Sequence, residues 1–269
     1  MKRMKALVLT FDKYRPFAEH MIMCYEDLWP NNPFTFRVPY QSEEVKESFE
    51  KIFGQKVEMI KSPSGIVDTM FALSDDLDEN EWVYWCMDDR YPIKLNVYEL
   101  EKMYQWVLSP KGAELTALMF ISAPRCWTPN RCYGKKYQIK AMGQRYVRRK
   151  DFMMIWNHQF MRVGFCRFFF NHFPRDMKSA KQMDFIRDTI LLPDHYKLYM
   201  LDHNIAIYGE HTSRGMVSKT CVKSFEEKGL PIPEGFEISD KEMITGNTTP
   251  WDNRKAIIKY RIKQFLGKK

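Results

Sequence analysis

Hydrophobic and polar positions follow two different spacings along the first 120 residues. Short, nearly continuous apolar runs, typical of buried parallel strands, alternate with longer segments whose apolar residues recur every three or four positions, as in amphipathic helices. The runs predict strands over residues 5–11, 34–38, 56–60 and 82–87, and the longer segments predict helices over 16–29, 42–53 and 64–77. This alternation favours an α/β fold with a parallel sheet covered by helices on both faces.

The pattern is less regular in the second half of the chain. It predicts helices over residues 97–108, 158–172 and 179–189, and strands over 115–122, 152–156, 197–201 and 205–208. No internal repeat or low-complexity linker interrupts the sequence. We therefore expect one domain over residues 1–250, with halves of about 1–122 and 123–250, followed by a basic C-terminal tail over 251–269.

Composition excludes several classes of protein. Hydrophobic residues make up 45% of the 269 residues, which is enough for a packed core and excludes a disordered or fibrous chain. No apolar run is long enough to span a membrane, and the start of the chain lacks the features of a secretory signal. The six cysteines include no Cys-x-x-Cys pair, so we expect reduced thiols and a cytoplasmic location.

Polar residues follow two of the predicted strands. In parallel sheets, ligands bind beyond the carboxyl ends of the strands. Two adjacent carboxylates after a buried strand repel each other, so a cation or a hydrogen-bond donor should lie nearby, although a solvated turn would look the same. The residues at these strand ends are Thr10, Asp12 and Lys13 after the first strand, and Asp88, Asp89 and Arg90 after the fourth.

Three segments resemble bacterial glycosyltransferases of the GT-A type: Leu-Val-Leu-Thr-Phe-Asp-Lys-Tyr, a helix ending in Leu-Trp-Pro, and Trp-Val-Tyr-Trp-Cys-Met-Asp-Asp-Arg. The resemblance covers residues 5–90. It implies a Rossmann-type, mostly parallel sheet flanked by helices, with a small C-terminal helical extension. It also implies that Thr10, Asp12 and Lys13 bind the nucleotide of a sugar donor, and that Asp88 and Asp89 form the acidic motif for the diphosphate.

One position departs from the family pattern. The usual motif is Asp-x-Asp, but Arg90 stands in the third position. Arginine is a permanent cation that binds phosphate through two hydrogen bonds, so it could replace the Mn²⁺ or Mg²⁺ of related enzymes. Metal dependence is therefore open. Asp89 of the acidic motif is a candidate metal ligand, and His211 could contribute a metal or phosphate contact, although a lone histidine is more often structural.

A second segment, Ser-Arg-Gly-Met-Val-Ser-Lys at residues 213–219, resembles the segment that closes over the donor diphosphate in these enzymes. Arg214 and Lys219 would bind the phosphates. A glycine between them permits close backbone approach, and the N-terminus of the following helix attracts anions. A basic surface turn is the alternative interpretation.

The resemblance also implies residues for the transfer itself. A transfer with inversion needs a general base, and Asp184 lies in the matching region, with Asp188 one helical turn later. Either could also be an exposed helical aspartate paired with a neighbouring basic residue. Trp156, Asn157 and Gln159 would contact the acceptor, or would be ordinary core and capping residues.

The C-terminal tail combines an apolar stripe with basic residues, and no acidic residue follows Asp252. This pattern is typical of a helix that lies in an anionic membrane surface, although the stripe could instead pack on the domain. The stripe consists of Ile257, Ile258, Ile262, Phe265 and Leu266.

Net charge raises a competing hypothesis. The chain has 42 Lys and Arg against 34 Asp and Glu, a formal net charge of +8, and residues 115–150 contain no acidic residue. Basic residues among aromatics can bind single-stranded nucleic acid. We expect no nucleic-acid partner, because that function leaves the paired carboxylates unexplained.

The sequence favours a glycosyltransferase of cell-surface polysaccharide synthesis, with a UDP-type sugar donor and a glycan or lipid-linked acceptor, peripheral at the inner membrane face. A nucleic-acid-binding protein, another nucleotide-sugar enzyme and a nucleotidyltransferase are the alternatives.

Overall fold

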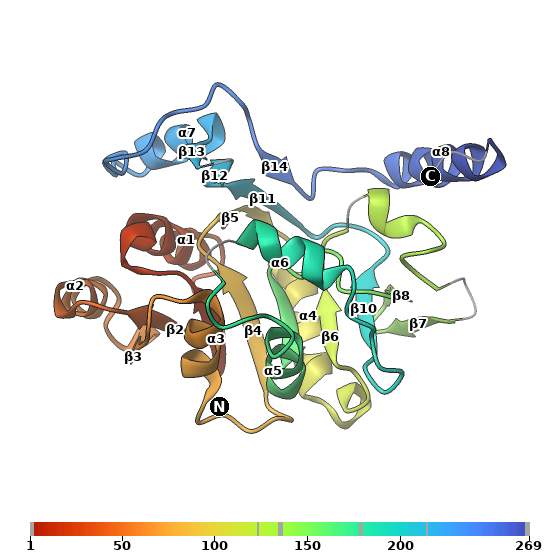
Figure 1. Ribbon diagram of the computed structural model, residues 1–269, viewed down its shortest axis with the longest axis horizontal. Coiled ribbons are helices and arrows are strands. Elements are labelled where there is room, and N and C mark those ends of the chain that lie inside the picture. The colour runs from red at the N-terminus through yellow and green to blue at the C-terminus, as the bar shows by residue number, and fades with distance from the viewer. Residues whose placement is uncertain (1–2, 123, 134–136, 178–179, 214, 267–269) are drawn as a thin grey trace.

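A nine-stranded sheet forms the centre of the protein in the computed structural model, which describes residues 3–122, 124–133, 137–177, 180–213 and 215–266 (Figure 1). The strand order is β3-β2-β1-β4-β9-β6-β10-β8-β7. Only β9 and β8 run against the direction of the other strands of this sheet. The strands are β1 (Met4–Leu9), β2 (Phe34–Tyr40), β3 (Val57–Lys61), β4 (Trp82–Met87), β6 (Ala117–Met119), β7 (Gln138–Ala141), β8 (Gln144–Arg148), β9 (Gln159–Arg162) and β10 (Leu198–Leu201).

Helices cover both faces of this sheet. Because side chains alternate along a strand, Ala6 and Val8 of β1 join a core cluster with residues of α1 and α4, and Leu7 joins a second cluster with residues of α3 and α5. The expected α/β fold with a mostly parallel sheet flanked by helices is confirmed. The helices are α1 (Arg15–Leu28), α2 (Glu43–Phe53), α3 (Ile66–Ser74), α4 (Val97–Leu108), α5 (Val163–Phe170), α6 (Ala180–Arg187), α7 (Lys219–Glu227) and α8 (Pro250–Phe265).

The strands and helices expected over residues 5–108 are present, although the strand Arg90–Leu95 was not predicted, and local signals set the helix boundaries. α2 begins after Ser42, whose hydroxyl accepts a hydrogen bond from the amide of Val45, and α4 begins after Asn96, which caps the amide of Glu99. All six cysteines are free and buried, as expected.

Two predictions for the second half are wrong. Residues 152–156 form turns rather than a strand, because the buried guanidinium of Arg149 binds the carbonyls of Asp151 and Met153 and bends the chain around itself. The predicted helix over 158–172 is helical only from Val163. Its first part is β9, which inserts between β4 and β6 and pairs antiparallel with both.

A small antiparallel sheet brings distant residues against the end of β4. It consists of β5 (Arg90–Leu95), β11 (Ala206–Glu210) and β14 (Ile244–Thr245), in the order β14-β11-β5. Arg90 pairs with Glu210 in this register. Gly209 is required here, because a Cβ at this position would lie 2.4 Å from the ring of Tyr91. The short strands β12 (Thr212–Ser213) and β13 (Met216–Val217) follow.

The remaining described residues add short 3₁₀ helices, of which Asp12–Tyr14 lies directly after β1 and Pro124–Trp127 lies beneath α8. In the described part of the chain, we find no helix with the length and apolar character needed to cross a membrane.

Candidate functional site

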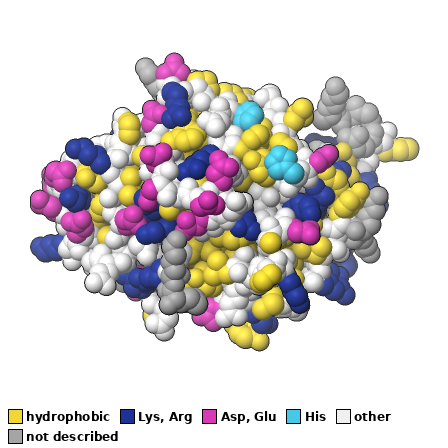
Figure 2. All heavy atoms as spheres, turned by 90° about the horizontal axis from the view of Figure 1, so that it is seen from below, with side chains coloured by type: hydrophobic (Ala, Val, Ile, Leu, Met, Phe, Trp, Pro, Cys, Tyr) yellow, Lys and Arg dark blue, Asp and Glu magenta, His cyan; other side chains and the backbone are white. Residues whose placement is uncertain are grey.

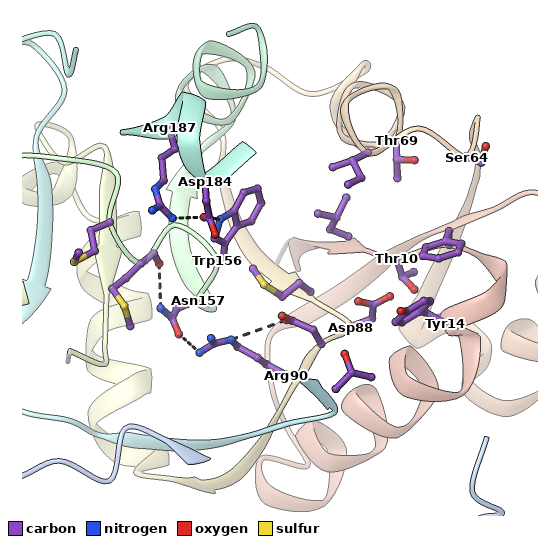
Figure 3. Close-up of a pocket in the computed structure, with 18 residues that line it drawn as sticks. Thr10, Tyr14, Ser64, Thr69, Asp88, Arg90, Trp156, Asn157, Asp184 and Arg187 are labelled. Atoms are coloured by element: carbon purple, nitrogen blue, oxygen red, sulfur yellow. Dashed lines mark hydrogen bonds and ion pairs between the residues drawn. The ribbon is translucent and has the colours of Figure 1, made fainter. Parts of the chain in front are cut away.

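A cavity of about 690 Å³ opens at the carboxyl ends of β1 and β4. Its base is formed by the turn after β4 (Figure 3). One wall comes from the segments after β1 and β3 together with α3, and the facing wall comes from the turns before β9 and from α6. The labelled lining residues are Thr10, Tyr14, Ser64, Thr69, Asp88, Arg90, Trp156, Asn157, Asp184 and Arg187.

Arg90 is held at the base of this cavity by three neighbours (Figure 3). Its Nη1 donates a hydrogen bond to Oδ1 of Asn157, and its Nη2 lies 3.2 Å from Oε1 of Glu210. Its Nε lies 4.0 Å from Oδ1 of Asp89, which is too long for a hydrogen bond. Both of these atoms are buried, and within the described part of the chain neither has a hydrogen-bond partner. The guanidinium is a permanent positive charge, and at the base of a cavity it attracts anions.

The two carboxyl groups beside Arg90 have raised pKa values. Burial raises the pKa of Asp89 to about 6; Arg90 opposes this rise and the Glu210 carboxylate adds to it. Burial, together with the charge of Asp89, holds the pKa of Asp88 well above its usual value. A protonated carboxyl donates a hydrogen bond, so this pair can approach phosphate oxygens without carrying two full negative charges.

His211 lies behind the acidic turn with both ring nitrogens engaged. Nδ1 is 2.5 Å from the carbonyl oxygen of Asp88, and Nε2 is 2.7 Å from Nδ1 of His20. Burial lowers the pKa of His211 well below its usual value, so the ring is neutral. This geometry does not fit His211 as a metal ligand. Among the described residues, no three His, Cys, Asp or Glu side chains form a group that could hold a metal ion.

Asp184 of α6 lies across the cavity from Asp88 (Figure 3). Its Oδ1 accepts hydrogen bonds from Nε1 of Trp156 at 2.9 Å and from Nη1 of Arg187 at 2.6 Å. Asp188 binds the same arginine through Nη2 at 3.2 Å, but it is exposed and does not line the cavity. One arginine thus fixes both candidate bases, and the structure brings only Asp184 to the cavity.

Other residues singled out from the sequence lie away from the cavity. The carboxylate of Asp12 accepts hydrogen bonds from the backbone amides of Gln41 (2.9 Å) and Ser42 (2.8 Å), so it ties the end of β1 to the start of α2. Lys13 places Nζ 5.2 Å from the centre of the Phe236 ring. Neither side chain lines the cavity.

Lys219 of the basic segment 213–219 and the acceptor candidate Gln159 do not line the cavity either. Lys219 is exposed at the first position of α7, and Arg214 lies outside the described residues. Gln159 is fully buried, and its Oε1 accepts a hydrogen bond from Nη1 of Arg149 at 3.2 Å. Thr212, directly before the basic segment, does line the cavity.

Several lining residues were not identified from the sequence. Tyr14 and Phe11 form an aromatic pair with ring centres 4.7 Å apart beside Thr10. Ser64 follows β3, so the strand-end rule applied to the third strand would have found it. No comparable signal marks Thr69, which projects from the interior of α3.

Comparisons with known proteins give structural neighbours only. No family model and no curated protein matches the sequence. Among solved structures, the chain is similar to 4-diphosphocytidyl-2C-methyl-D-erythritol synthase from Anaerococcus prevotii, with 9% identity, coverage of 85% of this chain and 96% of that chain, and a TM-score of 0.43. It is also similar to the galactosyltransferase LgtC in complex with donor and acceptor sugar analogues, with 11% identity, 94% coverage of both chains and a TM-score of 0.41.

Proposed function

We propose that the protein is a glycosyltransferase of GT-A type that transfers a sugar from a nucleotide-sugar donor, of UDP type, to a hydroxyl of a glycan or lipid-linked acceptor. One observation carries the proposal: a single cavity holds an arginine with two carboxyl groups at its base and a fixed carboxylate on its wall. These are the groups that such a transfer needs for its leaving group and its nucleophile. In this proposal residues 1–250 form one catalytic domain, which acts in polysaccharide synthesis on the cytoplasmic side of the inner membrane.

The donor would occupy the half of the cavity near β1 and β4. A volume of about 690 Å³ is within the usual range for small-ligand sites. Phe11 and Tyr14 offer an aromatic surface beside Thr10 for the nucleoside. Arg90 would attract the diphosphate through its positive charge, with the neighbouring carboxyls Asp88 and Asp89 as hydrogen-bond donors when protonated.

The transfer would begin with proton removal by Asp184. Both hydrogen bonds to this carboxylate go to Oδ1, so Oδ2 would accept the proton from the acceptor hydroxyl. The acceptor oxygen forms a bond to the anomeric carbon as the bond from that carbon to the phosphate oxygen breaks. The nucleoside diphosphate leaves with the electron pair, and Arg90 stabilises its charge. Attack on the face of the anomeric carbon opposite to the leaving phosphate inverts the configuration at that carbon, so in this proposal the transfer proceeds with inversion.

Calorimetric titration with UDP, GDP, CMP and TDP, each with and without Mn²⁺, tests the donor half of the proposal. We expect UDP to bind without added Mn²⁺, because Arg90 would supply the positive charge. Binding only in the presence of Mn²⁺ would assign that charge to a metal instead. Failure of all four nucleotides to bind would contradict the proposal, and binding of single-stranded oligonucleotides would then favour a nucleic-acid protein.

A second assay tests the reaction class. The protein is incubated with a nucleoside triphosphate and a sugar phosphate, and released pyrophosphate is measured. A glycosyltransferase releases none, since its donor already contains the diphosphate. Pyrophosphate release would identify a nucleotidyltransferase.

A further inference from the structure

Five large apolar side chains are exposed on or directly after α8. Phe265 is 91% exposed, and the other four are each more than half exposed. At 3.6 residues per turn, all five fall within an arc of about 100° on the helix surface. An outward apolar stripe on a protein surface marks an interaction site. Its residues are Trp251, Ile258, Ile262, Phe265 and Leu266.

Basic side chains flank this stripe on both sides. At the same helical spacing, Arg254 and Arg261 lie along one edge, and Lys259 and Lys263 lie along the other; all four are exposed. Lys255 is also exposed and falls within the arc of the stripe, with its Nζ 5.5 Å from the centre of the Trp251 ring. Asp252 is the single acidic residue of α8. Its carboxylate is occupied at the start of the helix, where it accepts hydrogen bonds from the backbone amide (2.9 Å) and hydroxyl (2.7 Å) of Thr249.

The rest of the protein holds α8 with this stripe outward. The face opposite to the stripe carries Ala256, Ile257 and Tyr260, which are half-buried, and the helix packs against the 3₁₀ helix Pro124–Trp127. The segment before α8 is fixed by Asn204, whose Nδ2 donates to the carbonyl of Gly246 at 2.9 Å. Of the stripe expected from the sequence, Ile257 therefore belongs to the inner face, and the other four members face outward.

We propose that α8 lies flat in the surface of an anionic lipid bilayer, with the apolar stripe inserted among the acyl chains and the flanking Lys and Arg side chains at the headgroups. Two other occupants fit less well. A second copy of α8 would bring like charges together, and nucleic acid would leave the aliphatic Ile258 and Ile262 without a partner.

The rest of the surface agrees with this orientation. Figure 2 shows that many acidic side chains of the face seen there gather toward the end of the molecule that holds α2, away from α8. Figure 1 shows α8 on the side of the central sheet toward which its parallel strands point. If the proposed function holds, the bilayer would therefore lie on the side of the molecule where the cavity opens, as a lipid-linked acceptor requires.

Co-sedimentation of the full chain with vesicles tests the proposal without any assay of transfer. The parent protein should sediment with vesicles of phosphatidylcholine and about one-third phosphatidylglycerol, and only weakly with phosphatidylcholine alone. The variant Ile258→Asp/Ile262→Asp should lose binding by ~100-fold or more, because charges replace two apolar side chains that insert into the bilayer in this proposal. Lys259→Gln/Lys263→Gln should weaken binding by about 30-fold, as two charges near the surface are lost.

The matched control is Ile52→Asp. Ile52 is 52% exposed on α2, against 53% for Ile258 on α8, and in Figure 1 the two helices lie at opposite ends of the molecule. This control should bind vesicles like the parent. Equal binding by the Ile258→Asp/Ile262→Asp variant, or no binding by the parent, would overturn the proposal, as would binding to a single-stranded oligonucleotide in place of vesicles. UDP binding measured on the same variants reports separately on the cavity.

Discussion

Nδ1 of His20 lies 2.7 Å from Nε2 of His211, and the hydrogen bond between these two rings runs in one direction. The carbonyl of Asp88 can only accept, so Nδ1 of His211 donates to it, and Nε2 of the neutral ring is left as an acceptor. Nδ1 of His20 is therefore the donor, and its Nε2 accepts from the hydroxyl of Ser224 at 2.9 Å. This chain of hydrogen bonds joins α7 and α1 to the turn that carries the acidic pair.

We expect protonation of His20 to oppose folding. Burial lowers its pKa to about 3 from an ordinary 6.5, so at pH 5 the unfolded chain binds a proton that the folded chain does not. The contribution of His20 to stability is complete above pH 6.5 and is lost as the pH falls toward 3, by about 1.4 kcal/mol per pH unit.

The variant His20→Gln isolates this contribution, because an amide keeps a donor and an acceptor but does not titrate. Urea unfolding between pH 7 and pH 4 gives the free energy of unfolding as a function of pH. The slope for His20→Gln should be shallower than that of the parent, and the difference should correspond to about one bound proton. Equal slopes for His20→Gln and the parent would contradict the lowered pKa of His20 in the folded protein.

Replacement of Arg90 should weaken nucleotide binding. Hydrogen bonds to charged groups contribute about 1.5–3 kcal/mol, so Arg90→Gln should raise the dissociation constant for UDP by about 10-fold to 100-fold. Because Gln also leaves Asp89 and Glu210 without a cation, Arg90→Lys is the second variant, which keeps the charge but not the planar donor group.

Isothermal titration calorimetry measures both variants. The control is Arg145→Gln, since Arg145 is 58% exposed and pairs with Asp202 away from the cavity lining. Parent-like affinity in both Arg90 variants would remove this residue from the donor site.

Asp184 and Asp188 form a natural pair for testing the base. Both bind Arg187, but only Asp184 lines the cavity. We expect Asp184→Asn to lower the rate of transfer by about 10²-fold to 10⁴-fold with unchanged UDP affinity, as is typical for loss of a general base. Asp188→Asn should keep most activity. The reverse ranking in a radiolabelled-sugar transfer assay would assign the base to Asp188.

A methyl group at position 209 should destabilise the fold. The Cβ of Gly209→Ala would lie 2.4 Å from the ring of Tyr91, which is fully buried and donates a hydrogen bond to the carbonyl of Thr220. We expect a loss of about 1–3 kcal/mol, measured from urea unfolding. Gly65→Ala, where the nearest atom would be 3.5 Å away, should change stability by less than about 0.5 kcal/mol. Equal stabilities for the two variants would show that β5 and β11 can shift apart.

The sequence predicts the fold best where one periodicity continues through a whole element. Apolar runs such as Trp82–Met87 have one plausible structure, because six consecutive buried side chains fit a central strand. Prediction fails at β9, where Gln159–Arg162 joins directly to a helix, so no turn residue marks the change. It also fails at residues 152–156, where a buried arginine outside the segment decides the backbone.

The candidate site could also be predicted from local sequence patterns but not where it depends on contacts between distant segments. The sequence identifies Thr10, Asp88 and Arg90 as site residues, because the carboxyl ends of parallel strands meet at one edge of the sheet. The engagement of Asp12 with the start of α2 and of His211 with His20 depends on contacts between segments far apart in the chain. Side-chain type alone does not distinguish such a structural partner from a ligand-binding residue.

The pairing of β5 with β11 also sets the order in which the protein can mature on the ribosome. Asp88 and His211 are separated by 123 residues, so the acidic turn gains its last partners only late in translation. A nascent chain that contains β1 to β4 already has the ends of these strands, but it lacks Glu210 and His211, which contact Arg90 and Asp88. Truncation before β11 would thus remove the contacts of Glu210 with Arg90 and of His211 with Asp88, while residues 1–122 would all be present.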